Sequence, residues 1–528
     1  MTAVYPAPVR PQRASVRWAA AITSRPVAVA LVVTVIVTAL RLTGPIDSDV
    51  ASQLWIAQRI HEGARLYRDI IEVNPPLWFW MALPIDRVAT LLHWTAPSVL
   101  IGAFGLLVAL SLTATERLLR HIGPGRRALF LTYAALILAA LPWVHVGQRE
   151  QIVLIGALPY AALIAARREG RSVPTFLAIA IGTGAALGFA LKHYFLMVPA
   201  ALELWLLLGL GRRWRPARPE TLAVAAVGAA YAAALLIEGD YLARMVPLVR
   251  LAYGQFGPRA IHFLFNPYLV IGAGLFAFTA AHARLLFSRS SSTATALFVA
   301  GLAFAATYFI QFKGWPYHTI PLLGCASLAL AALLAESASP PLLLRILTPA
   351  LLTLPLVASA SEATNPMPAN QDALQAVAGL SSGDEVGFLV TDTAIPSSVS
   401  FKDGFRNPSR YNGIWMMHAV VDNELDGDRD PRIAAFGRQV VANTVVDFRC
   451  TPPKRIIAER PRPGQRGFDI ITYYARDPQF AELLSHYRAR SRTTLETYEL
   501  VSPWAPPPPS LCRLLEAAWS ATARLVFL

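Results

Sequence analysis

The chain alternates long apolar runs with short polar gaps up to about residue 360. A helix that crosses a membrane needs about 20 predominantly apolar residues, and about eleven runs approach that length. These runs cover residues 26–42, 97–117, 127–143, 150–166, 173–190, 193–210, 220–237, 264–287, 294–311, 316–335 and 341–360. The polar pair Lys192-His193 is all that marks the boundary between the fifth and sixth runs. The pattern predicts a polytopic α-helical membrane protein.

The pattern changes after residue 361, where polar turns separate short runs of mixed character. Residues 385–391 and 456–458 resemble strands, and residues 478–490 resemble a helix. Short strands and helices of this kind are typical of a small α/β domain. The expected organisation is a tail over 1–25, a transmembrane module over 26–361 and an α/β domain over 362–528.

The composition supports a membrane protein. Of the 528 residues, 55% are apolar and only 15% are charged, whereas soluble proteins carry about 25% charged residues. This excludes a disordered chain and a soluble cytosolic enzyme. With Cys325, Cys450 and Cys512 as its only cysteines, the chain is no disulfide scaffold. Cys450 and Cys512 both fall in the α/β domain, where a pair and two free thiols are equally compatible with the sequence.

The charge distribution predicts the orientation in the membrane. The chain has 47 basic and 33 acidic residues, a net charge of +14, and its arginines gather in every second gap. Examples are Arg117, Arg120, Arg126, Arg127, Arg167, Arg168, Arg171, Arg212, Arg213, Arg215 and Arg218. Cytoplasmic loops carry such an excess, and a nucleic-acid surface would gather its arginines on one folded face. We therefore expect a cytoplasmic N-terminus, a periplasmic C-terminal domain and a location in the bacterial inner membrane. The long basic start is atypical of a cleaved signal, so the first run is expected to remain as a helix.

The first outer segment, residues 43–96, contains the main candidate catalytic residues. Asp47 and Asp49 follow the first apolar run, and carboxylates at a membrane surface are costly and usually functional. Alternatively, both are N-caps of the next helix. Residues 50–62 predict an amphipathic helix that lies on the membrane interface. Residues 77–92, which follow Pro75 and Pro76, predict a second interfacial helix.

This segment resembles the first-loop signature of the GT-C glycosyltransferases. The resemblance rests on an Asp after the first helix, an amphipathic helix, Gly63, Tyr67-Arg68-Asp69, Glu72 and Pro75-Pro76. It is strongest to the bacterial branch similar to protein O-mannosyltransferases and to lipid A aminoarabinose or galacturonic acid transferases. In layout it extends over residues 20–335. It implies an inverting transfer of a sugar from a polyprenyl-phosphate carrier to a glycan, lipid or protein acceptor on the outer face.

Two later outer gaps agree with the resemblance. One contains His145-Val-Gly-Gln-Arg149-Glu150, and the other contains Lys313-Gly-Trp315-Pro-Tyr317-His318, similar to the basic-aromatic patch that the family places near the carrier phosphate. Asn74 stands near the place where the aminoarabinose transferases have a lysine, so Lys192 or Lys313 is expected to supply that phosphate contact. Simpler interpretations are an interfacial anchor belt for the second motif and a local ion pair for Arg149 and Glu150.

The resemblance implies a role for each candidate residue. Asp49 is expected to be the general base, with Asp47 as the second choice, because the spacing from Asp49 to Gly63 matches the related pattern better. The expected substrate-binding residues are Glu72, Tyr67, Asp69, Arg149, Glu150, Lys192, His193, Lys313, Tyr317 and His318. Among these, Glu72 and Glu150 would orient hydroxyl groups, and Arg149, Lys192, Lys313 and His318 would line the phosphate.

No cofactor is required by these motifs. The sequence shows no Cys or His spacing typical of a metal site. A divalent cation held by the oxygens of Asp47, Asp49 and Glu150 is compatible with it. A second class of function also stays open, because a multispan transporter or flippase of a lipid-linked substrate can carry outward carboxylates. Transporters place ionisable residues near the bilayer midplane and often in repeated halves, whereas here they cluster at the outer ends of the runs.

Overall fold

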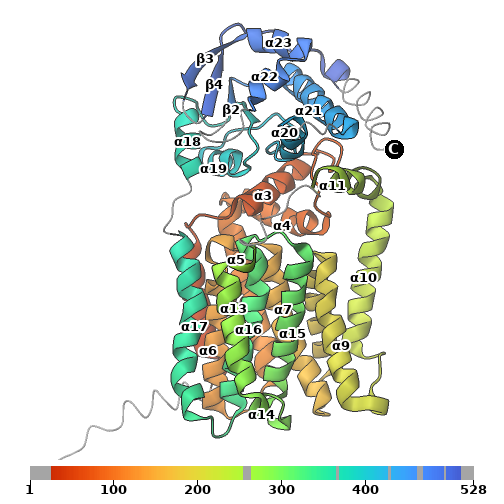
Figure 1. Cartoon of the computed structure of the whole chain (residues 1–528), viewed down its shortest axis with the longest axis vertical. Coiled ribbons are helices and arrows are strands. Elements are labelled where there is room, and N and C mark those ends of the chain that lie inside the picture. Colours follow the sequence, from red (N-terminus) through yellow and green to blue (C-terminus); the bar gives the residue numbers. More distant parts are fainter. Residues whose placement is uncertain are drawn as a thin grey trace, which may run out of the picture.

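The computed structural model describes residues 25–253, 263–363, 368–425, 430–460, 468–492 and 495–512. It consists of a bundle of long helices with a smaller mixed domain stacked on one end (Figure 1). The first outer segment lies between these two parts. The long helices are α2 (Pro26–Arg41), α5 (Ala96–Leu118), α6 (Pro124–Ala140), α7 (Arg149–Arg168), α8 (Thr175–Ala190), α9 (Met197–Leu210), α10 (Pro219–Glu238), α13 (Pro267–Ala281), α15 (Ser292–Gln311), α16 (Ile320–Glu336) and α17 (Leu342–Ala363).

Each predicted apolar run coincides with one of these helices. Among the described residues, seven helical segments are long and apolar enough to cross a membrane, and α2, α8 and α13 are shorter apolar helices. The chain is therefore a multi-pass membrane protein. Short helical turns extend several outer and inner ends: η1 (Trp143–His145), η2 (His193–Leu196), η3 (Gly211–Arg213), η4 (Tyr241–Met245), α11 (Val246–Ala252), α14 (Ala283–Leu286), η6 (Arg289–Ser291) and η7 (Pro316–Thr319).

The helices α7 and α16 form the centre of the bundle. In each of them, 94% of the apolar window is buried, whereas the corresponding figure for α10 at the edge of the bundle is 6%. Small residues allow α7 and α8 to approach closely, as is common between membrane helices. A Cβ atom on Gly188 would lie 2.9 Å from the Cα of Val153. The rigid centre of the bundle thus fixes the outer end of α7, where Arg149 begins the helix.

The first outer segment forms two helices, as predicted, and the first of them is buried against the C-terminal domain. Helix α3 (Ser48–His61) is buried on every side from Val50 to Ala57. Its outer side is covered by the C-terminal domain: Ser397 Oγ donates to the Ser48 carbonyl at 3.3 Å, and Arg59 Nη1 donates to the Asn407 carbonyl at 3.1 Å. Helix α3 therefore packs against the C-terminal domain, a contact that the sequence did not predict. Helix α4 (Leu77–Leu92) follows.

The C-terminal domain is a small α/β domain, as predicted. Its sheet has the order β1-β2-β4-β3, with β1 parallel to β2 and the other pairs antiparallel. Its elements are α18 (Pro368–Ala376), β1 (Val386–Leu389), α19 (Ala394–Asp403), α20 (Met417–Leu425), α21 (Pro431–Cys450), β2 (Arg455–Glu459), α22 (Ile470–Tyr474), α23 (Pro478–Ser485), β3 (Tyr487–Arg492) and β4 (Leu495–Leu500). Helix α21 makes the crossover between the parallel strands, which a hairpin cannot join.

Two details of this domain go beyond the sequence pattern. The helix predicted over 478–490 ends at Ser485, and residues 487–492 form strand β3 instead, because they pair with β4. Cys450 and Cys512 form a disulfide with their Cα atoms 5.9 Å apart. The pairing that the sequence left open therefore closes the end of α21 against the C-terminal segment.

Candidate active site

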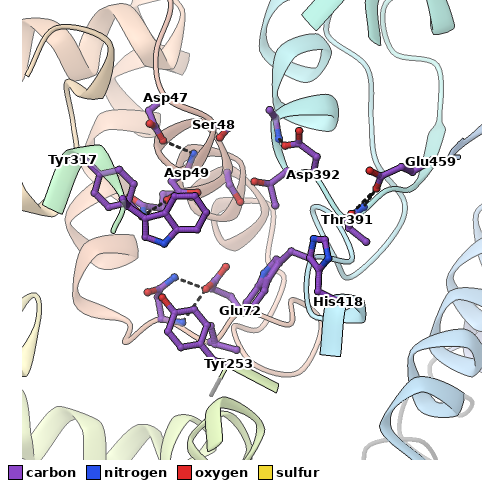
Figure 2. A pocket seen from close by; sticks show the side chains of 18 of the residues that line it. Asp47, Ser48, Asp49, Glu72, Tyr253, Tyr317, Thr391, Asp392, His418 and Glu459 are labelled. Carbon is purple, nitrogen blue, oxygen red and sulfur yellow. Dashed lines mark hydrogen bonds between the residues drawn. The ribbon is translucent and has the colours of Figure 1, made fainter. Parts of the chain in front are cut away.

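A cavity of about 870 Å³ lies between the first outer segment and the C-terminal domain. On the membrane side it is lined by residues that include Asp47, Asp49, Glu72, Arg149 and Tyr317. On the opposite side it is lined by residues that include Asp392, His418 and Glu459. Figure 2 shows these two groups facing one another across the space. The cavity thus joins the predicted catalytic segment to a domain for which the sequence offered no motif.

Asp49 lies in the first turn of α3 and lines the cavity. The hydroxyl of Tyr317, which follows α15 in the chain, donates a hydrogen bond to its Oδ2 at 2.8 Å. Burial and the nearby charge of Asp47 raise the pKa of Asp49 to about 6, against the opposing effect of the Tyr317 hydrogen bond. A carboxylate with such a pKa is mostly ionised at pH 7 and is still able to accept a proton.

Asp47 has a structural role at the start of α3. Its Oδ1 accepts hydrogen bonds from the backbone N–H of Asp49 at 2.8 Å and from Gln148 Nε2 at 3.0 Å. Its Oδ2 lies 2.7 Å from Nδ1 of His145. Asp47 is therefore the N-cap of α3, which is the simpler interpretation given above for both carboxylates. Asp49 is not the cap, and its side chain is left to face Tyr317 and the cavity.

His145 joins the first outer segment to the last helix of the bundle. Its Nδ1 contacts Asp47, and its Nε2 lies 3.3 Å from Oε1 of Glu362, which is near the end of α17. Burial lowers the pKa of His145, but the hydrogen bonds and charges of Asp47 and Glu362 outweigh it and raise that pKa to about 9. The imidazole is therefore protonated at neutral pH, and it holds two carboxylates that would otherwise repel each other.

A hydrogen-bonded group in the cavity lining consists of Glu72, Asn74 and Arg149. The side chain and backbone N–H of Asn74 both donate to Glu72 Oε1, at 2.6 and 2.9 Å. Arg149 Nη1 donates to Asn74 Oδ1 at 2.6 Å. Burial raises the pKa of Glu72, although the Asn74 hydrogen bonds oppose this effect. Asn74 therefore links the guanidinium of Arg149 to the carboxylate of Glu72.

Glu150, Lys192 and His318 form a separate buried cluster outside the cavity lining. Lys192 Nζ lies 2.5 Å from Glu150 Oε1 and 3.1 Å from His318 Nε2. Burial lowers the pKa of Lys192 to about 8, although the charge of Glu150 opposes this. Arg149 and Glu150 therefore point to different partners, and the local ion pair considered for them is not formed.

Lys313 lies at the edge of the site. Its ammonium is 4.0 Å from the centre of the Tyr253 ring and donates to the Tyr253 carbonyl at 3.0 Å. Tyr253 and Trp315 both line the cavity, and Lys313 itself does not. Burial lowers the pKa of Lys313. His193 is placed against the ring of Tyr194, with the two centroids 3.8 Å apart, and it also lies outside the lining.

Tyr67 and Asp69 support the first outer segment rather than line the cavity. Tyr67 has no exposed surface, and its hydroxyl donates to the Asn74 carbonyl at 2.7 Å. Asp69 accepts hydrogen bonds from Arg65 Nε and Nη2 at 2.9 and 2.8 Å. Tyr67 has a φ of 67°, which is unusual for a residue other than glycine. These contacts fix the turn that presents Glu72 and Asn74.

The oxygens considered for a divalent cation do not converge in this structure. Asp47 and Asp49 line the cavity, whereas Glu150 lies in the buried cluster with Lys192. Within the described part of the chain, no group of three or more His, Cys, Asp or Glu side chains is arranged to hold a metal ion.

Several lining residues were not singled out from the sequence. Gln53 belongs to the helix predicted over 50–62, and Glu362 lies just beyond the predicted run 341–360; nothing in the local pattern distinguishes either residue. Asp392, His418 and Glu459 come from three separate parts of the C-terminal domain. They meet only because the sheet and α20 place them on one side, so a motif of neighbouring residues does not exist for them.

A helix bundle with a small α/β domain stacked over a cavity at one end is a fold that this chain shares with solved structures. One of the proteins whose solved structure is similar to this chain is ArnT from Cupriavidus metallidurans. The structure of ArnT bound to undecaprenyl phosphate matches with a TM-score of 0.55 at 15% identity, over 94% of this chain and 100% of that chain. The apo structure of ArnT gives a TM-score of 0.53 at 16% identity, with the same coverage of both chains. No protein-family model matches the chain, and no curated protein matches it in sequence. At this level of identity the similarity establishes the fold.

Proposed function

We propose that this protein is an inverting glycosyltransferase that moves a sugar from a polyprenyl-phosphate carrier to an acceptor at the outer face of the membrane. The observation that carries the proposal is the position of Asp49. This carboxylate has a pKa raised to about 6, accepts a hydrogen bond from Tyr317 and lines a cavity that also contains the guanidinium of Arg149. A base and a cation in one enclosed space are what transfer from a glycosyl phosphate requires.

The proposed reaction is a single displacement. The acceptor oxygen attacks the anomeric carbon of the sugar while the bond between that carbon and the phosphate oxygen breaks. The bonding electron pair leaves with the phosphate, and the proton of the acceptor hydroxyl passes to Asp49. Glu72, which lines the same cavity, is proposed to hold a hydroxyl of the sugar or acceptor. Attack on the face opposite the leaving group inverts the anomeric centre.

Arg149 is proposed to face the phosphate. Its Nη1 is held by Asn74 Oδ1, and its Nε has no hydrogen-bond partner among the described residues. Buried donors that lack a partner are rare in folded proteins, and a phosphate oxygen would supply one. Lys313 and Trp315 stand at the rim, where we propose that they guide the carrier. Lys192 and His318 are proposed to have an indirect role: they fix the side chain of Glu150, which is next to Arg149 in the chain.

The carrier and the orientation belong to the same proposal. One of the ArnT structures contains undecaprenyl phosphate, and a carrier of this class fits a cavity at the outer end of a helix bundle. The arginine-rich gaps between α5 and α6, α7 and α8, and α9 and α10 support a cytoplasmic location for those ends. The cavity and the C-terminal domain would then lie in the periplasm of a bacterium, and the bundle in the inner membrane.

A transporter or flippase is less well supported. Transporters bind their substrates near the bilayer midplane, between discontinuous helices. Here the cavity lies beyond the outer helix ends, between the first outer segment and the C-terminal domain.

The proposal is tested with Asp49→Asn in full-length protein reconstituted into lipid vesicles with polyprenyl-phosphate sugars. We expect release of polyprenyl phosphate to fall by at least about 1,000-fold, since a general base contributes about 10²–10⁴-fold to the rate. Asp69→Asn is the matched control, because it makes the same change in the same segment outside the cavity lining. Comparable turnover by Asp49→Asn and the wild type would overturn the proposal.

A further inference from the structure

Two helices from different parts of the protein face the cavity with the same periodicity. Helix α20 of the C-terminal domain contributes His418, Val421, Asp422 and Leu425 to the lining. These positions are three or four residues apart and share one side of the helix. Helix α3 contributes Asp49, Ser52 and Gln53 in the same way. Gln53 and the α20 side of the cavity have no part in the proposed chemistry of Asp49. They also have no part in the capping of α3 by Asp47.

The side chain of Gln53 carries a buried acceptor, Oε1, that lacks a partner among the described residues. Its side chain lines the cavity, only 5% of the residue is exposed, and its Oε1 accepts no hydrogen bond from any described residue. A buried acceptor left in this state is energetically costly. A hydroxyl or amino group of a bound molecule would offset that cost. Because Gln53 lies one helical turn beyond Asp49, the molecule that it holds would sit next to the proposed base.

The opposite side of the cavity, here called the outer wall, consists of Asp392, Trp415, His418, Asp422 and Glu459. It provides three carboxylates. The neighbouring lining residue Arg460 is paired with Glu496 at 2.8 Å. Burial lowers the pKa of His418, although the three carboxylates oppose this, so its imidazole is neutral at pH 7. Glu459 Oε2 already accepts hydrogen bonds from Thr391, and Asp392 Oδ1 accepts one from the backbone N–H of Ala394. The remaining carboxylate oxygens of the outer wall can accept hydrogen bonds from a ligand and repel anions.

Aromatic rings complete the outer wall. Trp415 and Tyr253 both line the cavity and meet edge to face, with ring centroids 5.7 Å apart. Rings of this kind have an apolar face and a polar edge, and the carbon-bound hydrogens of a pyranose ring pack well against such a face. Carboxylates, a neutral imidazole and an amide oxygen next to aromatic rings suit a ligand with many hydroxyl groups.

We propose that Gln53 and the outer wall form an acceptor subsite that selects an uncharged, hydroxyl-rich saccharide over a phosphorylated one. This inference rests on the proposed function, since the bound saccharide is the group that Asp49 deprotonates. Gln53 holds a hydroxyl next to the base, and the carboxylates of the outer wall hold the more distant hydroxyls. A phosphate on the acceptor is excluded by those carboxylates.

The test is saccharide binding by the full-length protein in lipid nanodiscs, measured by saturation-transfer NMR. The probes are gluco-, manno- and galacto-trisaccharides and the same trisaccharides carrying one phosphate. We expect binding of at least one neutral trisaccharide and at least about ten-fold weaker binding of its phosphorylated form. Gln53→Leu and the exposed Asp422→Asn should each weaken binding about five- to ten-fold, the effect of one hydrogen bond. Glu482→Gln, a surface change in the same domain, should leave it unchanged.

The outcomes separate this inference from the proposed function. Equal or tighter binding of the phosphorylated probes, or no binding of any neutral probe, overturns the acceptor subsite. Binding that is unaffected by Gln53→Leu and Asp422→Asn also overturns it. Release of polyprenyl phosphate from the sugar donor is measured in the same nanodiscs, with the wild type and Asp49→Asn compared. Donor turnover without saccharide selection would leave the transferase proposal standing, whereas saccharide binding without donor turnover would remove it.

Discussion

The hydroxyl of Tyr317 donates a hydrogen bond of 2.8 Å to Oδ2 of Asp49, although the two residues are 268 positions apart in the chain. Tyr317 is buried in η7 at the outer end of α16, and Asp49 lies in the first turn of α3. The contact therefore joins the first outer segment to a helix at the centre of the bundle. It also favours the ionised carboxylate, which burial and Asp47 disfavour.

Removing this hydrogen bond should shift the pH dependence of transfer. Because Tyr317 lowers the pKa of Asp49, we expect Tyr317→Phe to raise that pKa from about 6 by about one unit. The acid limb of the rate profile moves upward by the same amount, so activity falls most near pH 6.5 and recovers toward pH 8. A rate profile across pH 5–9 measures this. Tyr308→Phe, which removes a hydroxyl bonded to the Phe263 carbonyl outside the cavity, is the control. A uniform loss at every pH would contradict the assignment.

Asp49→Asn should stabilise the protein while it abolishes transfer. The folded-state pKa of Asp49 lies above its unfolded value, so the ionised carboxylate destabilises the fold at neutral pH. The expected gain is up to about 2–3 kcal/mol above pH 6, and it disappears toward pH 4, where the carboxyl is neutral in both states. Thermal unfolding in nanodiscs at pH 4, 6 and 8 measures the difference. If Asp49→Asn melts at a lower temperature than the wild type at pH 8, the ionised Asp49 carboxylate does not destabilise the fold.

The contact of His145 with Asp47 and Glu362 should make stability depend on alkaline pH. The pKa of His145 is raised to about 9 in the folded state, so its contribution is fully present below about pH 6.5 and is lost as the pH rises through 9. The wild type should lose up to about 3 kcal/mol over that interval. His145→Gln should have a lower and flatter stability profile. If stability depends on pH in the same way in the wild type and in His145→Gln, the His145 imidazole is not charged between Asp47 and Glu362.

The buried pair of Lys192 and Glu150 should respond asymmetrically to single and double substitutions. Their charged atoms are 2.5 Å apart, and only 1% of the Glu150 side chain is exposed. Lys192→Met should cost about 3–5 kcal/mol, because it leaves a buried carboxylate without its cation. Adding Glu150→Gln should restore much of that stability. If the double variant also regains donor turnover, the pair positions Arg149. Turnover that stays lost after stability returns would instead give Lys192 a direct contact with the carrier phosphate.

The sequence predicted the helices of the bundle well and the packing around them poorly. Apolar runs such as 97–117 are local signals, and membrane burial of the backbone leaves a helix as the favoured structure. The burial of α3 between Val50 and Ala57 was missed because an amphipathic segment presents the same pattern to lipid and to a protein domain. The strand over 487–492 was missed for a similar reason, since its pairing partner β4 decides its conformation.

For the candidate site, too, local sequence signals determined one part and tertiary packing determined the other. The sequence by itself determined the membrane architecture, the small α/β domain and the segments that carry the candidate acids, because apolar length and residue spacing are local properties. Only the tertiary structure separated Asp47 as a helix cap from Asp49 in the cavity, and placed Lys192 on Glu150 and Arg149 on Asn74. It alone brought Gln53 opposite the outer wall. The physical reason is that a buried polar group takes whichever partner the packing of distant helices supplies, and nothing in its local sequence specifies that partner.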